Sequence, residues 1–122
     1  MNSKHTGLRV LVIEDSPVIA MATAHMLRTL GHIPLGPAGN MTTATALVGS
    51  EKMDAAIVDL NIRGTKAFSL LSVLNNRGIP FLIASGYADW NMPEEWLGRV
   101  RLQKPFSEAQ LQAKLTEIMQ EN

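Results

Sequence analysis

The chain has 122 residues, of which 46% are hydrophobic and 18% charged, the balance of one globular domain with a sizeable core. Eleven basic and eleven acidic residues cancel, which argues against nucleic-acid or anionic membrane partners, and the absence of cysteine excludes disulfides and thiolate chemistry. No apolar run is long enough for a membrane span or a signal peptide. We therefore expect a cytoplasmic protein with a flexible tail at residues 1–7 and one domain over residues 8–122.

Apolar runs and capping residues divide the chain into alternating strands and helices. Residues 8–13 are almost continuously apolar, which is typical of a strand buried on both faces. Ser16 and Pro17 are an N-cap and first-turn pair for the helix that follows. In chain order, the pattern predicts strands at 8–13, 32–37, 53–61, 79–85 and 100–106, and helices at 17–30, 40–50, 65–78 and 107–119.

The predicted helix ends and one irregular segment complete this assignment. Glycines at positions 31, 49 and 78 are expected to end the first three helices, and Ser107 to cap the last. The proline-marked strand at 32–37 is expected at a sheet edge. Residues 86–99 leave room for barely one and a half helical turns, so we expect a mobile segment there, with at most a short helix starting near Pro93. Ordering of this segment would change the emission of Trp90 and Trp96.

Alternation of buried strands with helices predicts an α/β fold in which helices cover both faces of a parallel sheet. Ligands bind such sheets at the carboxyl ends of the strands, where the strand order switches. Four of the predicted strands end in polar residues that would converge there: Glu14 with Asp15, Asp59 with Asn61, Ser85, and Lys104 with Pro105. Each residue alone is explained by a solvated turn or a strand terminator, and only their joint order indicates a site.

Three carboxylates in one pocket repel one another, and repulsion raises a carboxyl pKa unless a cation intervenes. Mg²⁺ suits this oxygen-rich set, and Mn²⁺ or Ca²⁺ can substitute, whereas zinc is not expected without imidazole or thiolate ligands. We expect Mg²⁺ to stabilise the fold. We also expect Asp15→Asn to raise the stability of the metal-free protein, because one repelling charge is removed.

The ordered set of strand-end residues resembles the receiver domain of bacterial two-component response regulators, over residues 8 to 119. The resemblance implies a flavodoxin-like, doubly wound, five-stranded parallel sheet of order 2-1-3-4-5, with a short or disordered fourth helix. It also implies that Asp15, Asp59 and the backbone carbonyl of Asn61 bind the metal directly, and that Glu14 acts through water.

The resemblance further implies that Asp59 accepts a phosphoryl group from the phosphohistidine of a sensor histidine kinase or a histidine phosphotransfer protein. Lys104 and the metal would neutralise charge on this group, and the Ser85 hydroxyl would bind one of its oxygens. Pro105 would follow a cis peptide bond that aims Lys104 into the pocket. The protein would signal by conformational change or drain phosphoryl groups, with no enzyme activity beyond self-phosphotransfer and autodephosphorylation.

The sequence PFLIASGY at residues 80–87 partly resembles the Phe-Ala-Thr-Gly-Tyr signature of an alphaproteobacterial subgroup of receivers, which implies a partner kinase of general stress signalling. Ile83 and Ser85 replace the Phe and Thr of that signature. Arg101 occupies the position where ordinary receivers carry an aromatic switch residue. Tyr87 is therefore a candidate for part of the switch role, and equally for a structural aromatic.

Other classes of protein remain open from the sequence. An aspartyl-phosphate phosphatase is disfavoured because Asn61 replaces its second, acid–base aspartate. A flavin-binding module is disfavoured because the first strand offers two anions where a phosphate-binding loop is needed. A receiver-like interaction module that is never phosphorylated is the remaining alternative.

Overall fold

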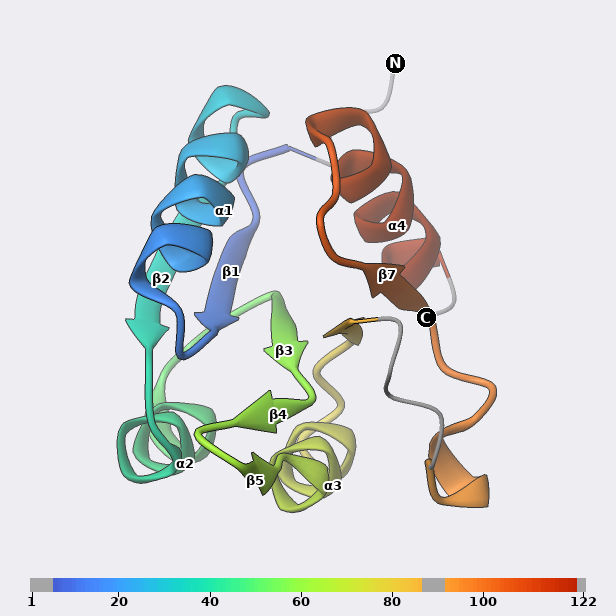
Figure 1. Ribbon diagram of the computed structural model, residues 1–122. Helices are drawn as coiled ribbons and strands as arrows, with labels where there is room; N and C mark the ends of the chain where they lie inside the picture. The colour runs from blue at the N-terminus through green and yellow to red at the C-terminus, as the bar shows by residue number, and fades with distance from the viewer. Residues whose placement is uncertain (1–5, 87–91, 121–122) are drawn as a thin grey trace.

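A central sheet of five parallel strands organises the computed structural model, which describes residues 6–86 and 92–120 (Figure 1). Across the sheet, the strands follow in the order β2 (Ile33–Ala38), β1 (Arg9–Ile13), β3 (Ala55–Asp59), β6 (Phe81–Ser85) and β7 (Arg101–Gln103). Each neighbouring pair is parallel. The predicted order 2-1-3-4-5 is confirmed, and the proline-marked β2 lies at an edge as predicted.

Helices cover both faces of this sheet, as expected (Figure 1). They are α1 (Pro17–Thr29), α2 (Met41–Ser50), α3 (Phe68–Asn76) and α4 (Glu108–Gln120). Leu11 and Ile13 of β1 pack in one core cluster with α2 and α3, whereas Val10 and Val12 pack in a second cluster with α1 and α4. Because successive strand residues point to opposite faces, both must be apolar, which explains the uninterrupted hydrophobic run.

Two of the predicted helix caps are present. Ser16 Oγ accepts a hydrogen bond from the backbone N–H of Ile19 at 3.3 Å, and Ser107 Oγ accepts one from Gln110 at 3.1 Å. Gly49 does not end α2, contrary to expectation. It lies inside the helix, which continues to Ser50 and ends where Glu51 turns to an extended conformation.

A short hairpin replaces the predicted start of the third helix. Strands β4 (Asn61–Ile62) and β5 (Thr65–Lys66) pair antiparallel, and α3 begins only after them, at Phe68. The turn between these strands needs positive φ at both of its residues, Arg63 at 51° and Gly64 at 83°. The hairpin buries Ile62 in the core, so the prediction of a helix from residue 65 was wrong for its first turn.

The segment before β7 contains a single 3-10 turn, η2 (Glu94–Trp96), preceded by Pro93. This confirms the prediction of a short helix starting near Pro93. The Trp96 ring packs edge-on against Phe81, with centroids 6.0 Å apart, and the Arg99 guanidinium lies 5.0 Å from the Phe81 ring. These contacts attach residues 96–99 to β6. Residues 87–91, with Tyr87 and Trp90, lie outside the described residues.

Along the described ranges 6–86 and 92–120, every helix is too short or too polar to cross a membrane.

Candidate functional site

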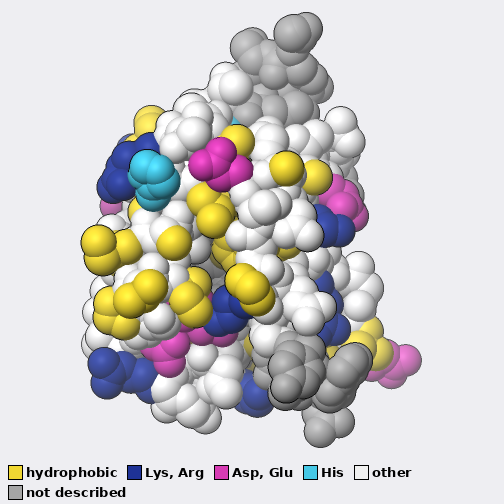
Figure 2. Space-filling view, turned by 45° about the horizontal axis from the view of Figure 1, so that its top comes forward, with side chains coloured by type: hydrophobic (Ala, Val, Ile, Leu, Met, Phe, Trp, Pro, Cys, Tyr) yellow, Lys and Arg dark blue, Asp and Glu magenta, His cyan; other side chains and the backbone are white. Residues whose placement is uncertain are grey.

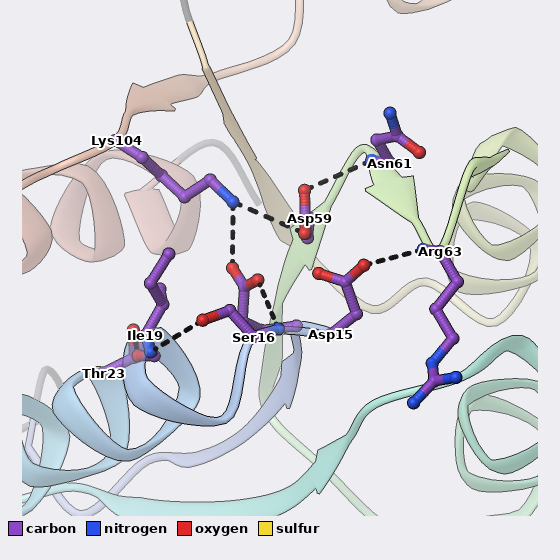
Figure 3. A network of polar contacts seen from close by, with 9 residues as sticks. Asp15, Ser16, Ile19, Thr23, Asp59, Asn61, Arg63 and Lys104 are labelled. Carbon is purple, nitrogen blue, oxygen red and sulfur yellow. Dashed lines mark hydrogen bonds and ion pairs between the residues drawn. The ribbon is translucent and has the colours of Figure 1, made fainter.

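Three carboxylates meet at the carboxyl ends of β1 and β3 (Figure 3). Glu14 and Asp15 directly follow β1, and Asp59 is the last residue of β3, which pairs with β1. One carboxylate oxygen from each lies within 4.8 Å of the others. Glu14 and Asp59 are buried and Asp15 is half-buried. The sheet therefore brings together the acids that the sequence predicted to converge.

Lys104 is the cation that faces these acids. It follows β7, on the other side of β6, and its Nζ lies 3.0 Å from Glu14 Oε1 and 3.4 Å from Asp59 Oδ2. The peptide bond between Lys104 and Pro105 is cis, as the resemblance implied. Burial alone would lower the pKa of Lys104, but the hydrogen bond to Glu14 and the charges of Asp59 and Glu14 together raise it. Lys104 is therefore held in its charged form.

The surroundings of Asp59 disfavour its ionised form. Burial, followed by the neighbouring charge of Glu14, raises the pKa of Asp59 to about 7, although Lys104 and the backbone N–H of Asn61 act in the opposite direction. That N–H donates to Asp59 Oδ1 at 3.2 Å. At neutral pH the folded chain alone thus leaves this carboxyl group partly protonated. A bound cation would compete with that proton.

Asp15 behaves differently from the expectation for a repelling charge. The backbone N–H of Arg63 donates to Asp15 Oδ2 at 2.7 Å, and this hydrogen bond is the largest of the effects that lower the pKa of Asp15. The fold favours its charged form, which argues against the expected stabilisation by Asp15→Asn. The sequence analysis missed Arg63, whose role comes from the β4–β5 turn. Only Gly64, a residue that tolerates positive φ, could have indicated that turn.

Glu14 is fixed by both of its oxygens. Oε1 accepts from Lys104, and Oε2 accepts from the backbone N–H of Ser16 at 3.0 Å, at the start of α1. Since this carboxylate already has two donors, a metal would reach it most readily through water, as the resemblance implied. The three acids supply hard oxygen donors within one small volume, which fits Mg²⁺.

Ser85 and Arg101 contact each other on β6 and β7, the two strands that lie between Asp59 and the edge of the sheet. Ser85 is the last residue of β6 and is buried, and the register pairs the residue before it, Ala84, with Asp59 at the end of β3. The Arg101 Nη2 atom donates to Ser85 Oγ at 3.4 Å. Arg101 thus contacts a predicted site residue, a contact that sequence spacing did not reveal. Tyr87 lies outside the described residues.

An apolar groove of about 310 Å³ adjoins Lys104. Its lining comes from α1 and from the loop after β7: Val18, Ile19, Ala22, Thr23, Met26, Lys104, Pro105 and Phe106. Val18 and Met21 are 77% and 71% exposed. Figure 2 shows hydrophobic side chains gathered on one face of the molecule, beside charged side chains of both signs.

A five-stranded parallel sheet of this order, with an acid cluster and a lysine at its carboxyl end, defines the receiver class of signalling domains. The family model of the response regulator receiver domain matches residues 10–116, and the chain belongs to this family. It is a receiver domain of two-component signalling, with an acidic pocket compatible with Mg²⁺ and with aspartate phosphorylation.

Solved structures agree with this assignment. SdrG from Sphingomonas melonis Fr1 is 32% identical, with 98% of this chain and 99% of that chain covered and a TM-score of 0.84. The BeF3-activated conformation of SdrG from Pseudomonas melonis Fr1 is 34% identical, covering 93% and 97% with a TM-score of 0.77. The receiver domain of the sensor histidine kinase PA1611 from Pseudomonas aeruginosa PAO1, with magnesium in its active site cleft, shares the fold at 24% identity, 94% and 99% coverage and a TM-score of 0.80. No curated protein sequence matches significantly.

Proposed function

We propose that the chain is a response regulator that accepts a phosphoryl group on Asp59 from a phosphohistidine, in the presence of Mg²⁺. One observation carries the proposal: the buried Asp59 lies within 4.8 Å of two further carboxylates and 3.4 Å from Lys104. Burying so many charges is costly unless a ligand uses them. A divalent cation and a phosphoryl group together complete this arrangement of charges.

The reaction forms one bond and breaks one. An Asp59 carboxylate oxygen attacks phosphorus, the bond between phosphorus and the donor imidazole nitrogen breaks, and the electron pair stays with the imidazole. The product is an acyl phosphate on Asp59 and an unmodified histidine on the donor. Because attack needs the ionised carboxylate, the raised pKa of Asp59 makes the reaction depend on a cation that displaces its proton.

The residues of the site divide this work. Asp15, Asp59 and the Asn61 carbonyl would hold Mg²⁺, with Glu14 acting through water, and the metal would supply positive charge to the phosphoryl oxygens. Lys104 exchanges its contact with Asp59 for one with a phosphoryl oxygen, as a compact point charge can. The Ser85 hydroxyl donates to another oxygen. The chain acts on itself, by phosphotransfer and autodephosphorylation, and on no other substrate.

The phosphohistidine partner is a sensor histidine kinase or a histidine phosphotransfer protein. Its histidine must come within bonding distance of Asp59, so its surface must cover the neighbourhood of Lys104. The apolar groove between α1 and the loop after β7 borders that lysine, and exposed Val18 enlarges the apolar surface. An apolar helical surface around the donor histidine fits this groove.

Intact-mass spectrometry tests the phosphoacceptor directly. Incubation with phosphoramidate or acetyl phosphate and Mg²⁺ should add one phosphoryl group to the wild type and none to Asp59→Asn. A matched control is Asp54→Asn, which changes an acid at the other end of β3 and should be modified as the wild type is. Equal modification of Asp59→Asn would refute the assignment.

A further inference from the structure

Arg101 begins β7, the strand that leads to Lys104, and its side chain contacts the hydroxyl group of Ser85. The register of β6 and β7 pairs Ile83 with Arg101 and Ser85 with Gln103. Because side chains alternate along a strand, Arg101 and Ser85 lie on the same face of the sheet, offset by two residues along it. The long side chain of Arg101 spans that offset, and its Nη2 reaches Ser85 Oγ at 3.4 Å.

The chemistry of the two groups gives this contact a direction. A hydroxyl offers one donor and two acceptor positions, whereas a guanidinium can only donate. Arg101 therefore occupies an acceptor position of Ser85 Oγ and cannot receive the hydroxyl proton. That proton stays available for another acceptor. A hydroxyl that accepts from a cation is also polarised into a stronger donor.

The position of Ser85 is restricted by burial and by backbone hydrogen bonds. Its side chain is 3% exposed, and its backbone carbonyl accepts from the N–H of Lys104 at 2.9 Å. The next strand, β3, ends at Asp59, and Leu60 donates to the carbonyl of Ala84 at 3.1 Å. The backbone that carries the Ser85 hydroxyl is thus fixed between the lysine strand and the strand that carries Asp59.

We propose that Arg101 is a positioning residue for phosphotransfer, which orients and polarises the Ser85 hydroxyl so that it donates to an oxygen of the phosphoryl group on Asp59. This inference rests on the proposed phosphoacceptor function of Asp59. A phenylalanine at this position could fill space but has no donor for the Ser85 hydroxyl, and a tyrosine would donate without a charge. Lysine would keep the charge but lose the planar fork, so we expect Arg101→Lys to be intermediate.

A double-mutant cycle separates this role from a structural one. The rate of Asp59 phosphorylation by saturating phosphoramidate and Mg²⁺ is measured by intact mass for wild type, Arg101→Ala, Ser85→Ala and the double variant. Arg101→Ala should be about fivefold slower than wild type, the factor that one net hydrogen bond produces. In the Ser85→Ala background the same change should have no further effect. Arg101→Lys should recover part of the rate.

Controls distinguish the ways in which the inference can fail. Gln103→Ala alters an exposed neighbour on β7 and should keep the wild-type rate, and all variants should keep the wild-type Mg²⁺ dissociation constant. An equal rate for Arg101→Ala, or a loss that persists without Ser85, overturns the role of Arg101 alone. A wild type that takes up no phosphoryl group overturns the proposed function, and this inference with it.

Discussion

The two ends of the sheet differ in how well the fold stabilises their buried polar groups. At the amino end, His32 is buried, its Nδ1 accepts from the N–H of Leu8 at 3.3 Å, and its Nε2 donates to Gln112 Oε1 at 3.0 Å. A neutral imidazole can make one bond of each kind, so the fold itself satisfies this residue. At the carboxyl end, Asp59 keeps a pKa of about 7 even with Lys104 beside it.

This difference separates a structural polar group from a functional one. A buried group whose partners come from the fold adds rigidity, whereas a buried cluster of like charges lowers stability until something binds it. Both ends contain buried titratable groups, so burial alone would not distinguish them. The two ends are distinguished by the balance of hydrogen-bond donors, acceptors and charges around the buried groups.

Loss of a buried polar group should reduce the free energy of unfolding more at the amino end of the sheet than at the carboxyl end. His32→Ala removes a buried ring and leaves the N–H of Leu8 without its acceptor, so we expect the free energy of unfolding to fall by about 3 kcal/mol. Because the site lies at the opposite end of β1, the Mg²⁺ dissociation constant should stay unchanged. Urea denaturation and a Mg²⁺ titration measure the two quantities, and a joint loss would mean that the ends are not independent.

Lys104→Ala changes the carboxyl end of the sheet, and its effect on the free energy of unfolding can be compared with that of His32→Ala. At pH 8, above the pKa of Asp59, this change leaves Glu14 and Asp59 without their cation, and we expect a loss of about 2 kcal/mol in metal-free protein. Mg²⁺ should restore most of that loss, because it supplies the missing charge. The phosphorylation-induced change in tryptophan emission should disappear, since the lysine no longer pairs with the phosphoryl group.

The exposed pair of Lys114 and Glu117, 3.5 Å apart on α4, provides the control for this variant. Lys114→Ala should cost less than about 0.5 kcal/mol, as surface pairs do. Equal losses in the two lysine variants, measured by urea denaturation, would contradict a special role for Lys104.

A separate effect of the acid cluster should appear in the pH dependence of stability. The pKa of Asp59 is raised from 3.8 to about 7, so the folded state binds this proton more tightly than the unfolded chain. This contribution to stability is full below pH 3.8 and is lost as the pH rises through about 7. Relative to Asp59→Asn, the metal-free wild type should therefore lose stability across that window, by at most about 4 kcal/mol, because each unit of pKa shift corresponds to about 1.4 kcal/mol. A constant difference between the two proteins would show that Asp59 is not perturbed.

The sequence predicted most of the sheet because its signals are local. Apolar runs marked the three central strands β1, β3 and β6, and Ser16 and Ser107 marked helix starts that the structure contains. Convergence of the acids with Lys104 followed from the parallel order of the strands. The hairpin was missed because its turn places Arg63 at a positive φ, which is uncommon for residues other than glycine and therefore is not expected from an arginine in the sequence.

Two further features that the sequence did not reveal are contacts between residues far apart in the chain, and one further error, at Gly49, is local. The hydrogen bond from Arg63 to Asp15, which argues against the expected effect of Asp15→Asn, depends on the β4–β5 turn reaching the loop after β1. The contact between Arg101 and Ser85 depends on the register of β6 and β7 together with the reach of a flexible side chain. Gly49 was misassigned because glycine is tolerated inside a helix at a modest cost.

The stability of the protein in Mg²⁺ tests most directly whether the carboxyl end is a site that its ligand completes. At about a hundredfold excess over the dissociation constant, Mg²⁺ should raise the free energy of unfolding by roughly 2.7 kcal/mol, because it binds only the folded acid cluster. Asp15→Asn should lose most of this gain, whereas Asp54→Asn, at the amino end, should keep it. A thermal melt that does not respond to Mg²⁺, or an equal gain in Asp15→Asn, would contradict the account.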